Sequence, residues 1–307
     1  MARSRVRVID GGGNGFRRSD MEDGIPSMPA ENRSISGVRD LLKFAAEDLP
    51  EGTLGIAYAT AGIIKDHDLV VLSPNLHWLN RIKLGTLTTK NTGLPTVVAN
   101  DMEAAVTGMR VLVPAVKGAA FIGITWSTGI GMRFVDSNGQ IVFPDTEGGH
   151  VRIDNSLEAP LCGCGQHGCV EAIAGGESLR WKVLSDTRLL GIDIPKGVHP
   201  CRFLDEAYGR GDPWAVSTYS FVTEAMADLL AIMQTIGHVP AIVWKGTVAE
   251  RMIPIIGNDI KAKLARKLIN PIWAGLDFHL SPHTGGVKNA DSFAGAAEIF
   301  LQEVMRK

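Results

Sequence analysis

The sequence has little of what marks membrane, secreted or nucleic-acid-binding proteins. No apolar run among its 307 residues reaches the length that spans a bilayer. The opening residues, MARSRVRVIDGGG, place arginines where a signal peptide has its apolar core. The 31 basic and 33 acidic residues leave a net charge of −2, without the positive excess that binds nucleic acid or an anionic membrane. We therefore expect a cytoplasmic protein with no nucleic-acid or membrane partner.

Cysteine is also scarce, and its placement is uneven. Three of the four cysteines lie within LCGCGQHGCVE, at positions 162, 164 and 169. In a reducing compartment, clustered cysteines indicate metal or redox chemistry more often than disulfides. The C-x-x-C spacing of thiol oxidoreductases is absent. Glycines at 163, 165 and 168 let the loop fold tightly enough for three sulfurs to meet. The spacing thus predicts a zinc site formed by Cys162, Cys164 and Cys169, with three unligated thiols as the alternative.

Zinc takes four tetrahedral ligands, so a fourth residue is needed. His167 lies inside the loop, and His150 ends the upstream stretch Glu147-Gly148-Gly149-His150. We favour His150, because His167 can point away from the centre that its neighbours share. A site closed by three cysteines and one histidine has no open position and would be structural. Cys201 stands apart and is expected to be a small buried residue.

Two strand–glycine-turn patterns divide the chain. Val6–Ile9 is β-rich and leads into Asp10-Gly11-Gly12-Gly13, and 119–125 leads into Ser127–Gly131. The repetition predicts a duplicated α/β architecture. The polar stretch from Ser19 to Asn32 is expected to be loop, and Asn138-Gly139 predicts a hairpin. Further expected helices and strands cover 36–47, 54–59, 68–72, 95–99, 102–109, 176–186, 214–236, 241–244, 249–266 and 292–305.

Glycine turns after strands can bring backbone N–H groups close to phosphate oxygens. Neither turn is a Walker A loop or a Rossmann fingerprint, and each alone is compatible with an ordinary hairpin. Asp10 beside the first turn can lie near a phosphate-bound Mg²⁺, because hard cations take carboxylate oxygens. Thr128 in the second turn offers a hydroxyl and an N–H to another phosphate. The pair of turns therefore favours a nucleotide site.

Asn100-Asp101 follows a short apolar strand, and ligands of α/β proteins bind at the carboxyl ends of strands. A carboxylate there can accept the proton of a hydroxyl that attacks phosphorus, even at an ordinary pKa, when proton transfer comes late. The alternative for Asp101 is a cap of the following helix, and the local sequence is equally compatible with both.

Together these residues resemble the ROK family of repressors, open reading frames and sugar kinases. Cys162–Glu171 is similar to its C-x-C-G-x-x-G-C-x-E signature, and Glu147–His150 matches its E-x-G-H motif. Ser73-Pro74-Asn75-Leu76, Asn100-Asp101 and both glycine turns follow the family's order. The resemblance covers nearly the whole chain.

The resemblance implies the actin-like ATPase fold of sugar kinases, with two α/β domains around a cleft. We expect a smaller domain over residues 1–100 and a larger one over 101–307, with the last helix packing back on the first domain. The larger domain would carry the zinc loop and the nucleotide side. Family members are often dimers or tetramers, so a homo-oligomer is expected.

The resemblance also implies roles for individual residues in an ATP-dependent kinase that phosphorylates the 6-hydroxyl of glucose or an N-acetylhexosamine. Asp101 would be the general base, and His150 would ligate Zn²⁺ as well as touch the sugar. The zinc loop would hold Glu147 and Glu171 against the sugar. The implied sugar contacts are Asn75, Asn100, Glu147, His150 and Glu171. The implied contacts to Mg²⁺ and ATP are Asp10, Gly11, Gly12, Gly13, Thr128, Gly129 and Gly246.

Departures from the family pattern fall mostly on the nucleotide side. Asn14 replaces a threonine, Ser127 replaces a glycine, and the hairpin after Phe16-Arg17-Arg18 looks truncated. A family glycine pair reads Trp244-Lys245-Gly246-Thr247, and the proline-glycine turn reads Ala61-Gly62. The alternative function is therefore a non-catalytic sugar-binding sensor. Direct repression of DNA is not expected, because the chain begins at the first strand without a helix-turn-helix.

Overall fold

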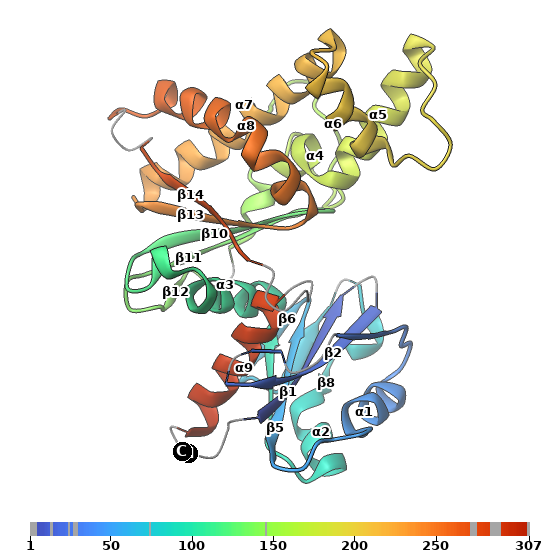
Figure 1. The fold of residues 1–307 in the computed structure, drawn as a ribbon, viewed down its shortest axis with the longest axis vertical. Coiled ribbons are helices and arrows are strands. Elements are labelled where there is room, and N and C mark those ends of the chain that lie inside the picture. Colours follow the sequence, from blue (N-terminus) through green and yellow to red (C-terminus); the bar gives the residue numbers. More distant parts are fainter. Residues whose placement is uncertain are drawn as a thin grey trace. The chain divides into compact units, whose positions relative to one another are not determined.

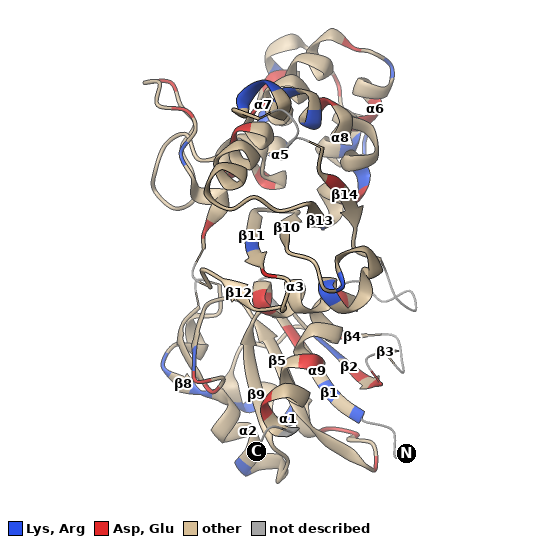
Figure 2. Cartoon of the chain, turned by 90° about the vertical axis from the view of Figure 1, so that its left-hand side faces the viewer, with Lys and Arg blue, Asp and Glu red and all other residues tan. Residues whose placement is uncertain are grey.

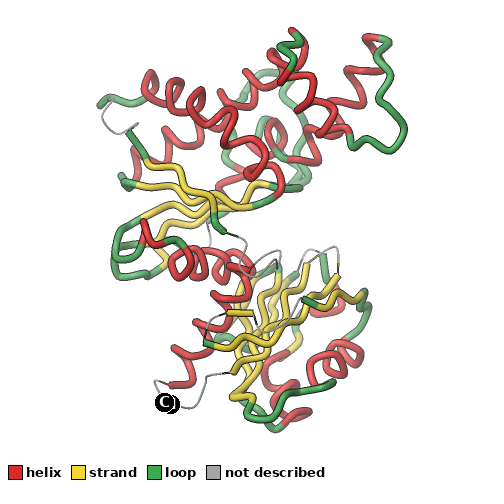
Figure 3. The backbone as a smooth tube through the Cα atoms, in the orientation of Figure 1, coloured by secondary structure: helices red, strands yellow, loops and turns green. Residues whose placement is uncertain are grey.

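The computed structural model describes residues 5–12, 15–23, 25–26, 30–73, 75–144, 146–270, 275–282 and 290–305. The chain forms two compact units, one of residues 1–118 with 281–307 and one of residues 119–280 (Figure 1). Each unit is built on its own mixed β-sheet, drawn in yellow in Figure 3. Among the described residues, no helix combines the length and the apolarity that a bilayer span needs.

The first unit is organised around a sheet with strand order β3-β2-β1-β5-β9, and β4 pairs with β2. β1 and β2 form an antiparallel hairpin, whereas β1–β5 and β5–β9 are parallel. A smaller antiparallel sheet has the order β6-β7-β8. The elements are β1 (Arg5–Gly12), β2 (Gly15–Glu22), β3 (Ile25–Pro26), β4 (Glu31–Arg33), α1 (Val38–Ala46), β5 (Thr53–Thr60), β6 (Ile63–Lys65), β7 (Leu69–Leu72), η1 (His77–Leu79), β8 (Ile82–Lys83), α2 (Leu84–Thr92), β9 (Thr96–Asn100), α3 (Asp101–Leu112), η2 (Pro114–Val116) and α9 (Ala290–Met305).

Both faces of this sheet are buried, because successive residues of a strand point to opposite faces and both sets are apolar here. Val8, Ala57 and Ala99 face a core that includes Phe293 and Phe300 of α9. The alternate positions of β1, β5 and β9 face a second core, which includes residues of α1, α2 and the small sheet. α3 packs on α9 through glycines, because a Cβ at position 108 or 295 would overlap backbone of the other helix. The first unit therefore continues past Asn100 to Gly118 and includes α9, whereas the sequence analysis drew its boundary at 100/101.

β2 corrects two expectations: residues 19–32 are not all loop, and the first hairpin is not truncated. β2 runs to Glu22 and pairs with β1 over its whole length. Three of its charged residues lie opposite a residue of opposite charge on β1, because the register sets Arg5 opposite Glu22, Arg7 opposite Asp20 and Asp10 opposite Arg17. Arg7 Nε lies 2.8 Å from Asp20 Oδ1, and Arg7 is only 2% exposed. Charged segments of both strands are visible in Figure 2.

The second unit repeats the pattern of the first: an antiparallel hairpin of β10 and β11 is followed by parallel pairing of β10, β13 and β14. The full order is β12-β11-β10-β13-β14. The predicted duplicated α/β architecture is therefore confirmed. The elements are β10 (Phe121–Trp126), β11 (Ile130–Val135), β12 (Ile141–Val142), η3 (Gly148–His150), α4 (Val170–Ala174), α5 (Gly176–Leu190), α6 (Pro200–Gly209), α7 (Pro213–Ile236), β13 (Ala241–Lys245), α8 (Thr247–Lys267) and β14 (Asp277–Leu280).

The core of the second unit lies between one face of its sheet and helices α4 to α8. Trp126 and Trp244 are both fully buried there, with ring centroids 6.0 Å apart. The Trp126 indole N–H donates to Ala174 O at 2.7 Å, which ties β10 to the end of α4. α2, α6 and β14 were not predicted from the sequence.

Candidate functional site: a Cys3His cluster and its neighbours

The cysteine loop is a tight double turn closed by backbone hydrogen bonds. Cys162 N–H donates to Gln166 O at 2.7 Å, and Gly165 N–H donates to Cys162 O at 2.9 Å. Gly165 and Gly168 have φ values of 88° and 78°, which glycine adopts without a steric penalty. Short bridges join Leu161 to His167 and Arg152 to Cys169. The two glycines therefore allow the reversals that bring the three cysteines together.

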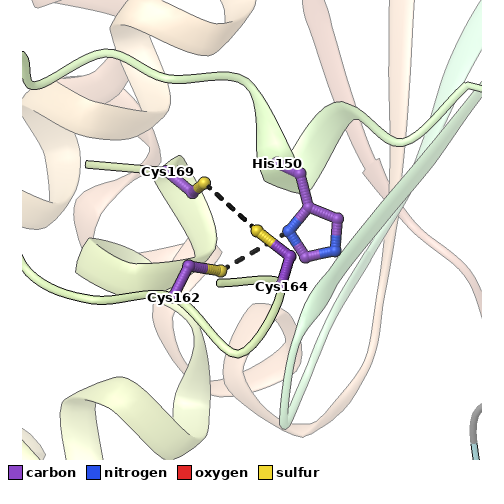
Figure 4. Close-up of side chains that lie close together, drawn as sticks. All are labelled: His150, Cys162, Cys164 and Cys169. Carbon is purple, nitrogen blue, oxygen red and sulfur yellow. Dashed lines mark hydrogen bonds between the residues drawn. The ribbon is translucent and has the colours of Figure 1, made fainter. Parts of the chain in front are cut away.

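Four ligand atoms converge at the end of this loop, from His150, Cys162, Cys164 and Cys169 (Figure 4). All lie within 4.8 Å of one another. The Cys164 and Cys169 sulfurs are 3.7 Å apart, and Cys162 Sγ is 3.5 Å from His150 Nδ1. A tetrahedral zinc with Zn–S near 2.3 Å and Zn–N near 2.05 Å needs separations of about 3.8 Å and about 3.6 Å. The donor set and its spacing thus fit zinc.

The electrostatics of the three thiols also fit a cation. Burial raises the pKa of Cys169 to about 12 and raises that of Cys162. A backbone hydrogen bond from Gln166 lowers the pKa of Cys164, which is exposed. Two of the three sulfurs therefore ionise with difficulty on their own, and a bound divalent cation would supply the charge that holds all three as thiolates.

The structure separates the two candidate histidines. The His167 ring turns to the loop backbone, where Nδ1 lies 2.8 Å from Ala159 O, and His167 is not one of the four converging residues. His150 is. Cys201 is buried in the core at the start of α6, with its sulfur 3.5 Å from Gly176 O, as expected for a residue outside the cluster.

The segment that carries Glu147 and His150 rests on β11. Glu147 precedes the turn η3 and is exposed. The two glycines between them lie against the strand: a Cβ on Gly148 would overlap Met132, and a Cβ on Gly149 would overlap Ile130 O. The two glycines between Glu147 and His150 are therefore required by the close packing of this turn on β11.

Glu171 lies two residues after Cys169 of the cluster, in the first turn of α4. Its Oε2 accepts a hydrogen bond from Ile130 N–H at 2.8 Å, and its Oε1 lies 4.0 Å from His150 Nδ1. The carboxylate thus joins the cysteine loop to the second glycine turn. Only glycine fits at position 129 beside this carboxylate, because a Cβ there would overlap Glu171 Oε2.

The second glycine turn is held by the helices that follow the cysteine loop. Gly176 N–H donates to Ser127 O at 2.8 Å, and Glu177 N–H donates to Thr128 O at 3.0 Å. The Thr128 side chain is left exposed. Gly246 is the cap residue before α8; its φ is 107°, and a Cβ there would overlap Trp126 O.

In the first unit, Asp10 lies near the end of β1 and is 6% exposed. Arg17 NH2 is 3.7 Å from Asp10 Oδ2, across the hairpin. The ring of Phe16 covers Gly11, where a Cβ would lie 3.2 Å from Phe16 Cζ. Gly12 ends β1, and Gly13 lies outside the described residues.

The Asn100-Asp101 pair resolves into a cap and a first helical residue. Asn100 is the cap of α3: its Oδ1 accepts hydrogen bonds from Met102 N–H and Glu103 N–H at 2.9 and 3.2 Å. Asn100 Nδ2 donates to Gly62 O at 2.9 Å. Asp101 opens the helix and is partly exposed. Asn100 is therefore the main cap, and Asp101 Oδ1 also accepts a hydrogen bond from Met102 N–H at 2.9 Å.

Asn75 is exposed, in the loop between β7 and η1. A residue that the sequence analysis did not single out holds this loop, since Asn80 Oδ1 accepts a hydrogen bond from Ser73 N–H at 2.7 Å. An asparagine close to Ser73-Pro74-Asn75 was the only available signal. The site residues thus fall into two groups: Asp10, Asn75, Asn100 and Asp101 in the first unit, and Glu147, His150 and Glu171 in the second.

The paired sheets, each opening with a hairpin and continuing in parallel strands, define an actin-like ATPase fold of the sugar-kinase type. The profile of the ROK family matches residues 25–303. The chain belongs to the ROK family.

Individual relatives agree with this assignment. An N-acetylmannosamine kinase of Escherichia coli is 31% identical over 222 residues, which are 71% of this chain and 72% of that protein. A ROK glucokinase from Streptomyces griseus, solved with glucose and AMPPNP, superposes with a TM-score of 0.75 at 22% identity and covers 96% of this chain and 99% of that chain.

A ROK transcriptional regulator, homologous to the E. coli MLC protein, superposes with a TM-score of 0.80 at 19% identity, covering 99% of this chain and 81% of that chain. At these identities the two structures inform on the fold alone. The predicted family and fold are confirmed, and the N-acetylmannosamine kinase relative supports the predicted class of enzyme, a sugar kinase.

Proposed function

We propose that the protein transfers a phosphoryl group from ATP to the 6-hydroxyl of a hexose, either glucose or an N-acetylhexosamine. The observation that carries the proposal is the junction of three motifs in the second unit. Glu147 immediately precedes η3, three residues before His150, and Glu171 stands beside His150 with its second oxygen on Ile130 N–H. Aimed acceptors of this kind suit a polyhydroxylated ligand, because an unpaired buried hydroxyl is costly.

Zinc held by His150, Cys162, Cys164 and Cys169 would be structural. All four positions are filled by protein atoms, which leaves none for substrate. The metal would hold the loop rigidly, and this would fix the orientation of the side chains on either side of it. Glu171 is in the helix that begins at the ligand Cys169, so its carboxylate would inherit that rigidity.

Asp101 is the general base of this proposal. It opens α3, and a carboxylate in the first turn of a helix is favourably placed with respect to the helix dipole. Asn100 caps the helix through Oδ1 and binds Gly62 O through Nδ2, and Asp101 Oδ1 also accepts a hydrogen bond from Met102 N–H at 2.9 Å. Asn100 retains one N–H for a sugar hydroxyl, and Asn75 would contribute a further amide.

Asp10, Gly11, Gly12, Gly13, Thr128, Gly129 and Gly246 are the proposed residues on the nucleotide side. MgATP, when bound, would supply the phosphoryl group and the cation that neutralises its charge. The protein's part is to present backbone N–H groups at the glycine turns and the Asp10 carboxylate near the metal. Homo-oligomerisation and a cytoplasmic location stay predictions.

The test is a phosphoryl-transfer assay with MgATP on glucose, mannose, fructose, N-acetylglucosamine and N-acetylmannosamine, combined with calorimetric sugar binding. Asp101→Asn should abolish turnover on the accepted sugar and leave its dissociation constant within about threefold, because a base acts on the transition state. Asp40→Asn is the matched control: Asp40 is an exposed aspartate in the first turn of α1. It should leave turnover unchanged.

The outcomes separate the candidates. Turnover on one sugar that Asp101→Asn removes supports the kinase and identifies the acceptor. Sugar binding without turnover would reject the kinase and favour the sugar sensor. Equal loss of binding and turnover in Asp101→Asn would contradict the assignment of the base.

A further inference from the structure

β11 carries one residue that its apolar neighbours do not explain. Met132 and Phe134 are in the core of the second unit, and Arg133 lies between them. Arg133 is only 5% exposed. The residue opposite it on β10 is Gly123, which offers no acidic side chain. Burying a guanidinium is unfavourable unless strong acceptors receive its N–H groups.

The acceptors are backbone carbonyls. Arg133 NH1 donates to Met132 O at 2.8 Å and also to Thr146 O. Within the described part of the chain, no carboxylate forms an ion pair with Arg133. Hydrogen bonds from an ionised donor are shorter and stronger than neutral ones. The guanidinium therefore acts as a strong tether for the Thr146 carbonyl.

That tether sits at the entry to the Glu147–His150 segment, because Thr146 directly precedes Glu147. Thr146 is held from the other side as well, since its N–H and its hydroxyl both donate to Phe143 O, at 3.1 and 2.6 Å. Beyond it, His150 N–H donates to Glu147 O at 2.9 Å. The glycines of the segment rest on β11, so the same strand that carries Arg133 also supports the turn.

We propose that Arg133 is a positioning residue for sugar binding. Its guanidinium fixes the Thr146 carbonyl, this fixes the backbone on which Glu147 is mounted, and the sugar meets a carboxylate already in place. The inference rests on the proposed function, in which Glu147 receives sugar hydroxyls. Arg133 itself touches neither sugar nor nucleotide in this proposal.

The test compares Arg133→Met, which keeps the stem and removes the donors, with Arg133→Lys, which keeps a charged donor. Arg202→Met is the control, because Arg202 is an exposed arginine on α6 paired with Glu206. Two readouts are taken on the full chain with zinc retained. Hydrogen exchange at the amides of His150 and Val151 reports the segment directly, and steady-state kinetics reports sugar KM, ATP KM and kcat.

Arg133→Met should speed exchange at these two amides about tenfold and raise sugar KM about tenfold, with kcat and ATP KM within about twofold. For Arg133→Lys, the exchange rate and the sugar KM should lie between those of Arg133→Met and the wild type. For Arg202→Met, both should match the wild type. Zinc content should stay at the wild-type level in all variants.

Unchanged exchange at His150 and Val151 in Arg133→Met would overturn the tether, whatever the kinetics. Faster exchange with an unchanged sugar KM would overturn the link to sugar binding. A wild-type protein that neither binds nor phosphorylates any sugar would instead reject the proposed function, and the exchange readout would still decide whether Arg133 holds the segment.

Discussion

Substituting Gly129 by alanine tests whether Glu171 joins the cysteine loop to the second glycine turn. The φ of Gly129 is not in the left-handed region, so alanine adds no backbone strain there. The three atoms nearest to a Cβ at this position all belong to Glu171: Oε2, which it would overlap, Cδ at 3.1 Å and Oε1 at 3.7 Å. The carboxylate must therefore move, and its hydrogen bond from Ile130 N–H is lost.

The magnitude follows from that bond. A hydrogen bond to a charged group contributes about 1.5–3 kcal/mol. The Glu171 side chain is 26% exposed, and water replaces part of what is lost. We expect Gly129→Ala to lower the free energy of unfolding by about 1–2 kcal/mol. In a Glu171→Ala background the new methyl group meets no carboxylate, and the same substitution should cost about zero, a coupling of about 1–2 kcal/mol.

Urea denaturation of the wild type, both single variants and the double variant measures this coupling. Gly209→Ala is the control, since a Cβ at Gly209 in α6 would meet nothing within 4 Å and should be neutral or slightly stabilising. Additive costs of Gly129→Ala and Glu171→Ala would refute the reasoning, because they would mean that the methyl group destabilises through something other than the carboxylate.

Three further predictions concern the metal, a buried ion pair and pH. Cys169→Ser should reduce bound zinc from about one per chain to near zero by elemental analysis, whereas Cys201→Ser should retain it; equal zinc in both would exclude the Cys3His site. Arg7→Met removes the bidentate partner of the buried Asp20 and should cost about 3 kcal/mol or more in urea unfolding. Arg5→Met, at the partly exposed pair with Glu22, should cost less than about 1 kcal/mol, and equal costs would contradict the burial argument. The hydrogen bond from Lys267 lowers the pKa of Glu224. The stabilisation by this pair is therefore present above the unfolded pKa of about 4.3 and is lost as pH falls through the lower folded pKa. The difference in unfolding free energy between wild type and Glu224→Gln should be largest near pH 7 and should vanish below the folded pKa.

The cysteine loop could be predicted from the sequence because its information is local. Spacing and glycines alone place Cys162, Cys164 and Cys169 around one centre, and the structure adds the fourth donor atom, His150 Nδ1. His150 was favoured over His167 from the sequence, and the structure agrees, because His150 lies with the three cysteines. No local rule says that His167 turns to Ala159 O, which is what removes it from the cluster.

β2 could not be predicted for the opposite reason. Its residues are polar and read as loop, and their partners lie on another strand. Arg7 and Asp20 stabilise each other only when the register sets them opposite, and no window of the sequence contains both sides of that pair in a strand pattern. The burial of Arg133 could not be predicted for the same reason, because its acceptor, Thr146 O, lies beyond the next hairpin.

Asn100 and Asp101 show a limit of a different kind. Both residue types cap helices, and the sequence places them side by side at the end of a strand. Only the backbone decides that α3 begins one residue later than Asn100, with Asn100 Oδ1 accepting two N–H groups. The amide of Asn100 is the main cap, and Asp101 Oδ1 also accepts a hydrogen bond from Met102 N–H at 2.9 Å.

The departures from the family pattern at Trp244 and Lys245 acquire a physical meaning in the same way. Trp244 is fully buried, with its ring 6.0 Å from Trp126 and 5.2 Å from Phe278, so the large residue fills the core of the second unit. The position that cannot change is the next glycine: Gly246 has φ 107°, and a Cβ there would overlap Trp126 O. The core thus accommodates a large side chain at position 244, whereas the glycine that a side chain would obstruct, Gly246, is present. The turn that starts α8 is thus preserved, and its altered composition is by itself no argument against phosphoryl transfer.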